Sequence, residues 1–183
     1  MKKTLRLLIF LLAITLFLFI SSIGVYAWVE YHVNIFWCVD SGKHLDWSGS
    51  TRYSSYWETG INTWNNHRSG VIRKDTILTI NDATIQDVDD LSGDVVAQTH
   101  TNYPTGGGKG TCNIYFSITK MNICTDIQKT IVCTHEIGHA LGLDENNSSV
   151  YNVMYQHMLS NQSNNVLSPA DKNNYDYMYY NKY

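Results

Sequence analysis

The chain has 183 residues, of which 44% are hydrophobic and only 16% are charged, and its formal net charge is −3. This composition excludes a strongly basic protein that binds nucleic acid, and it excludes a chain that its own charge keeps disordered. We therefore expect a folded protein without a nucleic-acid partner.

The N-terminal segment differs from the rest of the chain. Three basic residues within the first six precede an apolar run over residues 7–20, and the segment ends in Val25-Tyr26-Ala27. This three-part pattern is typical of a secretory signal peptide that is cleaved after Ala27. The apolar run is also close to the length that spans a bilayer, so residues 1–27 could instead remain as a membrane anchor.

Either outcome places residues 28–183 outside the cytoplasm as a single domain, which is secreted or held at the cell surface. All four cysteines of the chain lie in this domain: Cys38, Cys112, Cys124 and Cys133. An even number of cysteines in an oxidising compartment predicts two disulfides, and the spacing leaves all three pairings open.

Hydrophobic periodicity predicts a mixture of strands and helices in this domain. Residues 30–39 alternate in a way that indicates a strand with one buried face. Residues 56–66 repeat large apolar side chains every three or four positions, which indicates an amphipathic helix. Further strands are predicted over residues 77–80 and 94–101, and another over residues 113–118 after a glycine-rich loop. Strands interspersed with helices indicate a mixed α/β arrangement.

A cluster of acidic residues lies between the predicted second and third strands. Its members are Asp82, Asp87, Asp89, Asp90 and Asp94. Oxygen ligands at this density could hold Ca²⁺, although their spacing matches no EF-hand loop and a solvated acidic turn is the commoner explanation.

A second helix is predicted to begin near Asp126, because Thr125 and Gln128 fit a capping box at a helix N-terminus. It should run to about Leu141, since Gly142 supplies the left-handed residue that ends many helices.

This helix carries the run His135-Glu136-Ile137-Gly138-His139. Two histidines four residues apart project from one face of a helix, close enough for both imidazoles to bind one metal ion. Zn²⁺ is the natural occupant of such a pair, and Glu136 projects beside it.

The string from His135 to Glu145 resembles the extended zinc signature of the metzincin metallopeptidases, most nearly that of the matrixin-like branch. Asn152-Val153-Met154-Tyr155 resembles the Met-turn of that clan, a methionine loop beneath the metal. Residues 113–118 resemble the edge strand that aligns an extended substrate, and Ser168-Pro169-Ala170-Asp171 resembles the start of the C-terminal helix. The resemblance implies an α+β, metzincin-like zincin domain: a twisted mixed sheet with an active-site helix, a Met-turn and a C-terminal helix.

The signature departs from the family pattern at its eleventh position. A histidine is expected there, but the chain has Glu145, preceded by Asp144. The register favours Glu145 as the third zinc ligand with Asp144 as the alternative, since both offer oxygen atoms that zinc accepts. If neither binds, His157 is the nearest remaining imidazole in the sequence.

The function implied by this resemblance is that of a secreted zinc-dependent endopeptidase. Zn²⁺ held by His135, His139 and Glu145 would activate a water molecule, Glu136 would act as the general base, and Met154 would shape the floor of the site. The protein would act as a monomer on protein or peptide substrates, with a membrane partner only if the N-terminal segment is retained. The alternative is a non-catalytic exported binding module that keeps zinc for stability.

Overall fold

The computed structural model describes residues 30–157 and 164–183. Residues Tyr31–Tyr183 form one compact unit. The predicted signal peptide, residues 1–27, lies outside the described residues, so its cleavage stays a prediction. Among the residues that the structure describes, no helix combines the length and the apolar character needed to cross a membrane.

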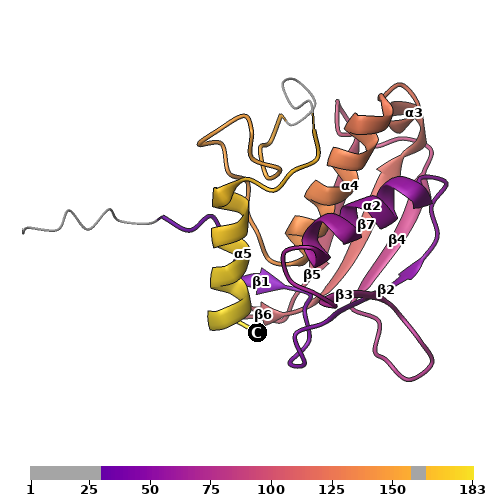
Figure 1. The fold of residues 1–183 in the computed structure, drawn as a ribbon. Coiled ribbons are helices and arrows are strands. Elements are labelled where there is room, and N and C mark those ends of the chain that lie inside the picture. Colours follow the sequence, from indigo (N-terminus) through magenta and orange to yellow (C-terminus); the bar gives the residue numbers. More distant parts are fainter. Residues whose placement is uncertain (1–29, 158–163) are drawn as a thin grey trace, which may run out of the picture. The chain divides into compact units, whose positions relative to one another are not determined.

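A five-stranded sheet in the order β3-β2-β4-β7-β5 forms the centre of this unit (Figure 1). Its strands are β2 (Leu45–Gly49), β3 (Ile72–Lys74), β4 (Ala83–Val88), β5 (Ala97–Asn102) and β7 (Thr111–Ser117). All neighbouring strands pair in parallel except β5, which is antiparallel to β7. The last strand, β5, therefore forms one edge of the sheet. The predicted mixed sheet is confirmed.

Two helices, α2 (Ser54–Asn65) and α4 (Asp126–Ala140), lie side by side over one face of the sheet (Figure 1). The predicted amphipathic helix corresponds to α2, which buries Trp57 against the sheet. The Trp57 ring packs edge-on against Trp47 of β2 and Phe116 of β7, with ring centroids 5.6 and 6.0 Å apart. The core thus lies between these helices and the sheet, and it fixes the position of α4.

The remaining elements are short or lie at the periphery. They are β1 (Phe36–Trp37), which pairs in parallel with β6 (Gly108–Lys109), the short helix α3 (Ile118–Met121) and the C-terminal helix α5 (Pro169–Asn181). The predicted start of the C-terminal helix is confirmed: Ser168 is the N-cap of α5 and forms a capping box with Asp171.

One disulfide joins Cys38 to Cys112, while Cys124 and Cys133 are free. The prediction of two disulfides is therefore wrong for the second pair. Cys124 precedes α4 and Cys133 lies two turns inside it, so the rise of the helix separates them by about 10 Å along its axis. A disulfide requires Cα atoms within about 7 Å of each other.

The strand predicted over residues 30–39 is mostly irregular. Only β1 and an isolated bridge from Val33 to Leu143 have strand pairing. Tyr31 and Ile35 should lie on the buried face but are 41% and 64% exposed. Tyr31 instead stacks on Tyr177 of α5, with ring centroids 4.2 Å apart. Tyr31 therefore packs on a distant helix and not on a sheet face.

The strand predicted over residues 77–80 is wrong as well, because these residues form a loop between β3 and β4. Ile77 and Leu78 are fully or almost fully exposed. The Thr76 N–H donates a hydrogen bond to Thr79 Oγ1 (2.8 Å), and the Thr79 N–H donates one to the Thr76 carbonyl (3.1 Å). These local bonds make a turn that competes with strand pairing.

Candidate metal centre

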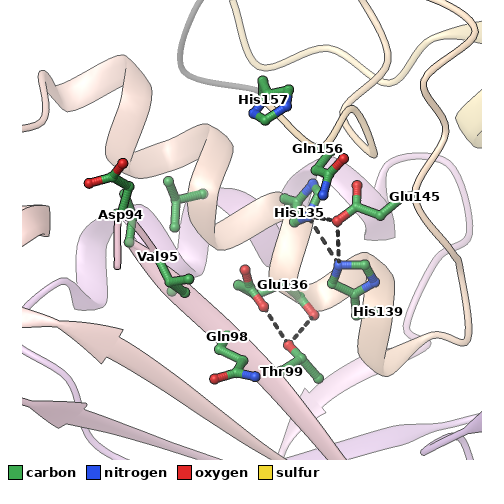
Figure 2. Close-up of a pocket in the computed structure, with 13 residues that line it drawn as sticks. Asp94, Val95, Gln98, Thr99, His135, Glu136, His139, Glu145, Gln156 and His157 are labelled. Carbon is green, nitrogen blue, oxygen red and sulfur yellow. Dashed lines mark hydrogen bonds and ion pairs between the residues drawn. The ribbon is translucent and has the colours of Figure 1, made fainter. Parts of the chain in front are cut away.

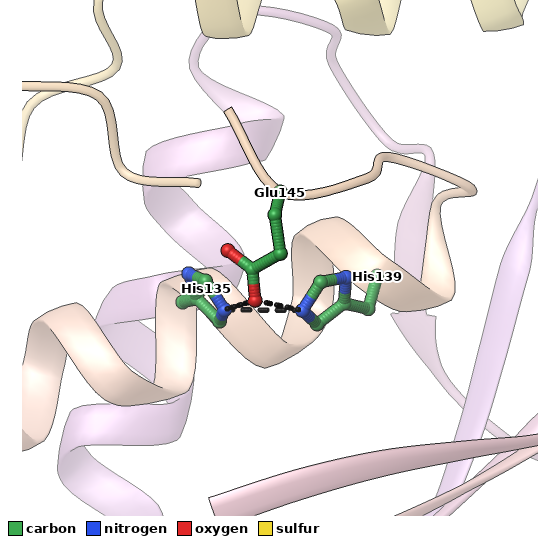
Figure 3. Close-up of side chains that lie close together, drawn as sticks. All are labelled: His135, His139 and Glu145. Atoms are coloured by element: carbon green, nitrogen blue, oxygen red, sulfur yellow. Dashed lines mark hydrogen bonds and ion pairs between the residues drawn. The ribbon is translucent and has the colours of Figure 1, made fainter. Parts of the chain in front are cut away.

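Helix α4 brings two imidazoles together on one of its faces. Its predicted capping box is confirmed, with the Thr125 side chain accepting from Gln128 N–H and the Gln128 side chain accepting from Thr125 N–H. The Nε2 atoms of His135 and His139 lie 3.0 Å apart (Figure 3).

Backbone carbonyls orient both rings. His135 Nδ1 lies 2.8 Å from the Val153 carbonyl, and His139 Nδ1 lies 3.0 Å from the Leu143 carbonyl. A carbonyl oxygen can only accept, so each Nδ1 carries the hydrogen and each Nε2 of the neutral ring keeps its lone pair. This tautomer is the one that binds a metal through Nε2.

The chain after α4 turns back and places a carboxylate opposite the two rings. Gly142, with φ of +84°, ends the helix, as predicted. Glu145 Oε1 then lies 3.5 Å from His135 Nε2 and 3.6 Å from His139 Nε2 (Figure 3). Asp144 is exposed, and its Oδ1 accepts a hydrogen bond from Glu145 N–H (2.8 Å). The structure thus brings Glu145, and not Asp144, to the histidines.

The three donor atoms fit a zinc ion. Zinc bonds of about 2.0–2.2 Å in a tetrahedron separate neighbouring ligand atoms by about 3.3–3.5 Å. The separations here are 3.0, 3.5 and 3.6 Å. The second carboxylate oxygen, Glu145 Oε2, is buried and has no hydrogen-bond partner among the described residues. A buried oxygen without a partner indicates a group that the protein chain itself does not supply.

Electrostatics also favour a cation at this place. Burial alone would lower the pKa of His139, but the hydrogen bond that its ring donates to the Glu145 carboxylate and nearby negative charge raise that pKa to about 9. Burial would raise the pKa of Glu145, yet the two histidines lower it to about 2. In the absence of metal, a protonated His139 therefore balances the charge of the Glu145 carboxylate, and a metal ion that binds His139 must displace this proton.

Met154 packs against helix α4. It is fully buried, and a Cβ atom added at Gly138 would lie only 2.3 Å from its sulfur. A residue with a side chain at position 138 would therefore collide with the methionine. The buried Asp171 carboxylate accepts hydrogen bonds from Val153 N–H (2.9 Å) and Met154 N–H (3.3 Å), which ties this turn to α5.

A cleft of about 700 Å³ opens beside these residues (Figure 2). Residues 94–99 of the β5 region form one wall, α4 forms the other, and Gln156 and His157 close one side. Glu136 faces the cleft from α4 and is only 3% exposed. The Thr99 hydroxyl lies 2.7 Å from Glu136 Oε2.

The edge strand beside the cleft is β5, so the prediction that residues 113–118 form it is wrong. Residues 113–117 belong to β7, which pairs with β4 on one side and with β5 on the other. The Ser117 N–H donates to the Val96 carbonyl (2.9 Å), and these two residues lie opposite each other in the register. Hydrogen-bonded and free positions alternate along an antiparallel pair. Ala97 and Thr99 therefore direct their backbone N–H and C=O groups to the open edge.

The aspartates considered for Ca²⁺ do not gather into one site. Asp87 accepts from Thr51 Oγ1 (2.5 Å), and Asp90 accepts from Ser117 Oγ (2.9 Å) and pairs with a lysine. Asp82 lies near Asp40 and Asp46, but cationic side chains pair with this group: Lys109 with Asp82 and Arg73 with Asp46. Calcium binding stays a prediction without a ligand set.

The family model of the matrixins, a family of peptidases, matches residues 51–180. The chain belongs to the matrixin family. The match extends from just before α2 into α5, so it includes the zinc signature, the Met-turn and the cleft. Comparison with curated proteins gives no match. As a matrixin, the chain has the α+β metzincin fold, and its family is one of zinc metallopeptidases that act on proteins or peptides.

Two contacts of this matrixin's site had no signal in the sequence. Thr99 reaches Glu136 across 37 residues, and Asp171 reaches Val153 across 18. From the sequence, Asp171 was placed only in the first turn of the C-terminal helix, and Thr99 was given no role. Each contact depends on how distant elements pack, which residue spacing does not reveal.

Proposed function

We propose that this matrixin is a secreted zinc-dependent endopeptidase in which His135, His139 and Glu145 bind the zinc ion and Glu136 is the general base. The observation that carries this proposal is the convergence of three donor atoms, within 3.0–3.6 Å of each other, beside a buried carboxylate in an open cleft. The donor set of two histidines and one glutamate is one that catalytic zinc sites use.

The proposed reaction adds water across a peptide bond. Bound Zn²⁺ would supply a Lewis acid that polarises the scissile carbonyl and lowers the pKa of a water molecule. Glu136 lies on the same helix face as the cleft and takes the proton from the attacking water through a carboxylate oxygen. It then gives the proton to the leaving amine as the C–N bond breaks, so the base is regenerated.

The free edge of β5 would hold the substrate in an extended conformation. The outward backbone groups of Ala97 and Thr99 line the cleft opposite α4. A substrate strand that pairs with them gains main-chain hydrogen bonds that do not depend on its sequence. Proteins and peptides with unfolded segments are therefore the expected substrates.

The alternative, a non-catalytic module with a structural zinc site, fits the geometry less well. Structural sites usually complete a tetrahedron with four protein ligands. Among the described residues, only His135, His139 and Glu145 converge at the centre, which leaves a fourth position for water or substrate. A buried Glu136 beside that position serves no purpose in a structural site.

Export is proposed from the N-terminal signal pattern alone. Retention of residues 1–27 would give the same enzyme anchored at the cell surface. Action as a monomer remains part of the proposal in both cases.

The test compares the zinc-loaded parent protein with the Glu136→Gln variant on casein, an unfolded substrate. We expect the parent to cleave casein and the variant to lose about 10²- to 10⁴-fold in rate while it binds as much zinc as the parent. A folded, zinc-loaded parent that cleaves neither casein nor mixed unfolded peptides would contradict the proposal and favour the binding module.

A further inference from the structure

The hydroxyl of Thr99 on β5 contacts the proposed general base directly (Figure 2). Thr99 Oγ1 lies 2.7 Å from Glu136 Oε2 and 3.1 Å from the Glu136 backbone carbonyl oxygen. Both partners are acceptors, so the single hydroxyl hydrogen can go to only one of them at a time. The shorter contact leads to the charged carboxylate, which forms the stronger hydrogen bond.

This contact restricts the Glu136 side chain, whose carboxylate has few other partners. Among the described residues, Thr99 is the only side chain that hydrogen-bonds the Glu136 carboxylate. A glutamate has three rotatable bonds, and the cleft leaves room beside it. The bond to Oε2 fixes the plane of the carboxylate and leaves Oε1 available for the proton that moves.

The same residue also lies where the substrate backbone is expected. Thr99 is opposite Ile114 in the β5–β7 register, at a position whose backbone N–H and C=O face the open edge. Its side chain points from the sheet toward α4, because Thr99 and Ala97 share the face that lines the cleft. One residue therefore lies both at the edge where a substrate strand is expected and in contact with the proposed base.

We propose that Thr99 is a positioning residue for Glu136: its hydroxyl holds Oε2, so that docking of a substrate strand on β5 and alignment of the base depend on the same residue. This inference rests on the proposed function of Glu136 as the general base. Thr99 itself takes no proton and does not bind the metal.

The kinetic test uses Thr99→Val, which removes the hydroxyl at nearly constant shape, and Thr99→Ser, which keeps it. Thr101→Val is the matched control, since Thr101 lies on the same strand and face but has its hydroxyl 3.7 Å from Cys112 Sγ. For a peptide that the parent cleaves, we expect Thr99→Val to lower kcat by about 10- to 100-fold, with KM and zinc content unchanged, as for loss of one hydrogen bond to a charged group.

Thr99→Ser should keep kcat within about threefold of the parent, and Thr101→Val should match the parent. Equal kcat in Thr99→Val and the parent would overturn the proposal. A loss in Thr99→Val that Thr99→Ser shares to the same extent would overturn it too, because the methyl group and not the hydroxyl would then matter.

A crystal structure of each variant gives a readout that does not need activity. We expect the Glu136 carboxylate to leave its present position in Thr99→Val and to keep it in Thr99→Ser. A parent protein that cleaves no peptide would contradict the proposed function, whereas an unmoved Glu136 carboxylate in Thr99→Val would contradict the positioning role alone.

Discussion

One wall of the cleft, helix α4, is buried and contacted from several directions, whereas the opposite wall, β5, has a hydrogen-bonded neighbour on one side only. The imidazoles of the two proposed zinc ligands on α4 are oriented by the carbonyls of Val153 and Leu143. The backbone of β5 is left open at Ala97 and Thr99. In the proposed function, the buried wall thus holds the groups whose geometry the chemistry needs, and the open wall holds backbone groups with which a substrate strand can pair.

The largest effect on stability should come from Asp171, which holds the turn at Val153 and Met154 beside the buried wall. Asp171 is fully buried and accepts from the backbone N–H groups of Val153, Met154 and Ser168. Asp171→Ala would leave three amides without a partner, and we expect the free energy of unfolding to fall by about 3 kcal/mol or more. Urea denaturation measures this change. Asp171→Asn keeps one acceptor oxygen and should lose less, and equal losses in the two variants would contradict the account.

The methionine beneath α4 should have the next largest effect. Met154→Ala would open a cavity below Gly138, and we expect the free energy of unfolding to fall by about 2–4 kcal/mol. Met154→Leu keeps the volume and should cost less than about 1.5 kcal/mol. Thermal or urea unfolding of both variants checks the difference. A Met154→Ala variant with the same free energy of unfolding as the parent would show that the methionine does not support helix α4.

Pairing of a substrate with the open edge of β5 can be tested with proline substitutions at two neighbouring positions. Ala97→Pro removes an N–H that faces the open edge, so the sheet should keep its hydrogen bonds and KM for a peptide should rise about 3- to 10-fold. Gln98→Pro removes an N–H that faces β7 and should destabilise the fold. A KM unchanged by Ala97→Pro, with the fold intact, would exclude pairing of the substrate with β5 at this position.

The smallest effect should be the pH dependence of the metal-free protein. Because the pKa of Glu145 is lowered to about 2, its contribution to the free energy of unfolding is present above about pH 4.5 and is lost as the pH falls toward 2. Because the pKa of His139 is raised to about 9, its contribution to the free energy of unfolding is complete below about pH 6.5 and is lost as the pH rises through 9.

The two limits together predict that the pair stabilises the metal-free protein most between about pH 4.5 and 6.5. Glu145→Gln should remove this stabilisation. Urea denaturation of chelator-treated parent and variant from pH 3 to pH 9 should show their difference in unfolding free energy to be largest in that window. A difference that does not change with pH would contradict the ion pair.

The active-site helix could be predicted from the sequence because its signals are local. Thr125 and Gln128 are three residues apart, the two histidines are four apart, and Gly142 directly follows the last turn. The same holds for the start of α5 at Ser168. In each case, residues within one helical turn of each other determine the structure.

The sheet order could not be predicted because strand pairing joins distant residues. Nothing within a strand shows which of its sides stays unpaired, so residues 113–118 were assigned to the edge that β5 occupies. The strands β2 and β3 have only five and three residues, too few for a clear alternation. Thr99 was missed for the same reason, since its role depends on the position of β5 against α4.

The most direct test of the account is the zinc content of the parent protein, Glu145→Ala and Asp144→Ala. We predict about one zinc ion per chain in the parent and in Asp144→Ala, and loss of most zinc in Glu145→Ala with the fold intact by circular dichroism. Retention of zinc by Glu145→Ala, together with its loss in Asp144→Ala, would contradict the metal centre described above.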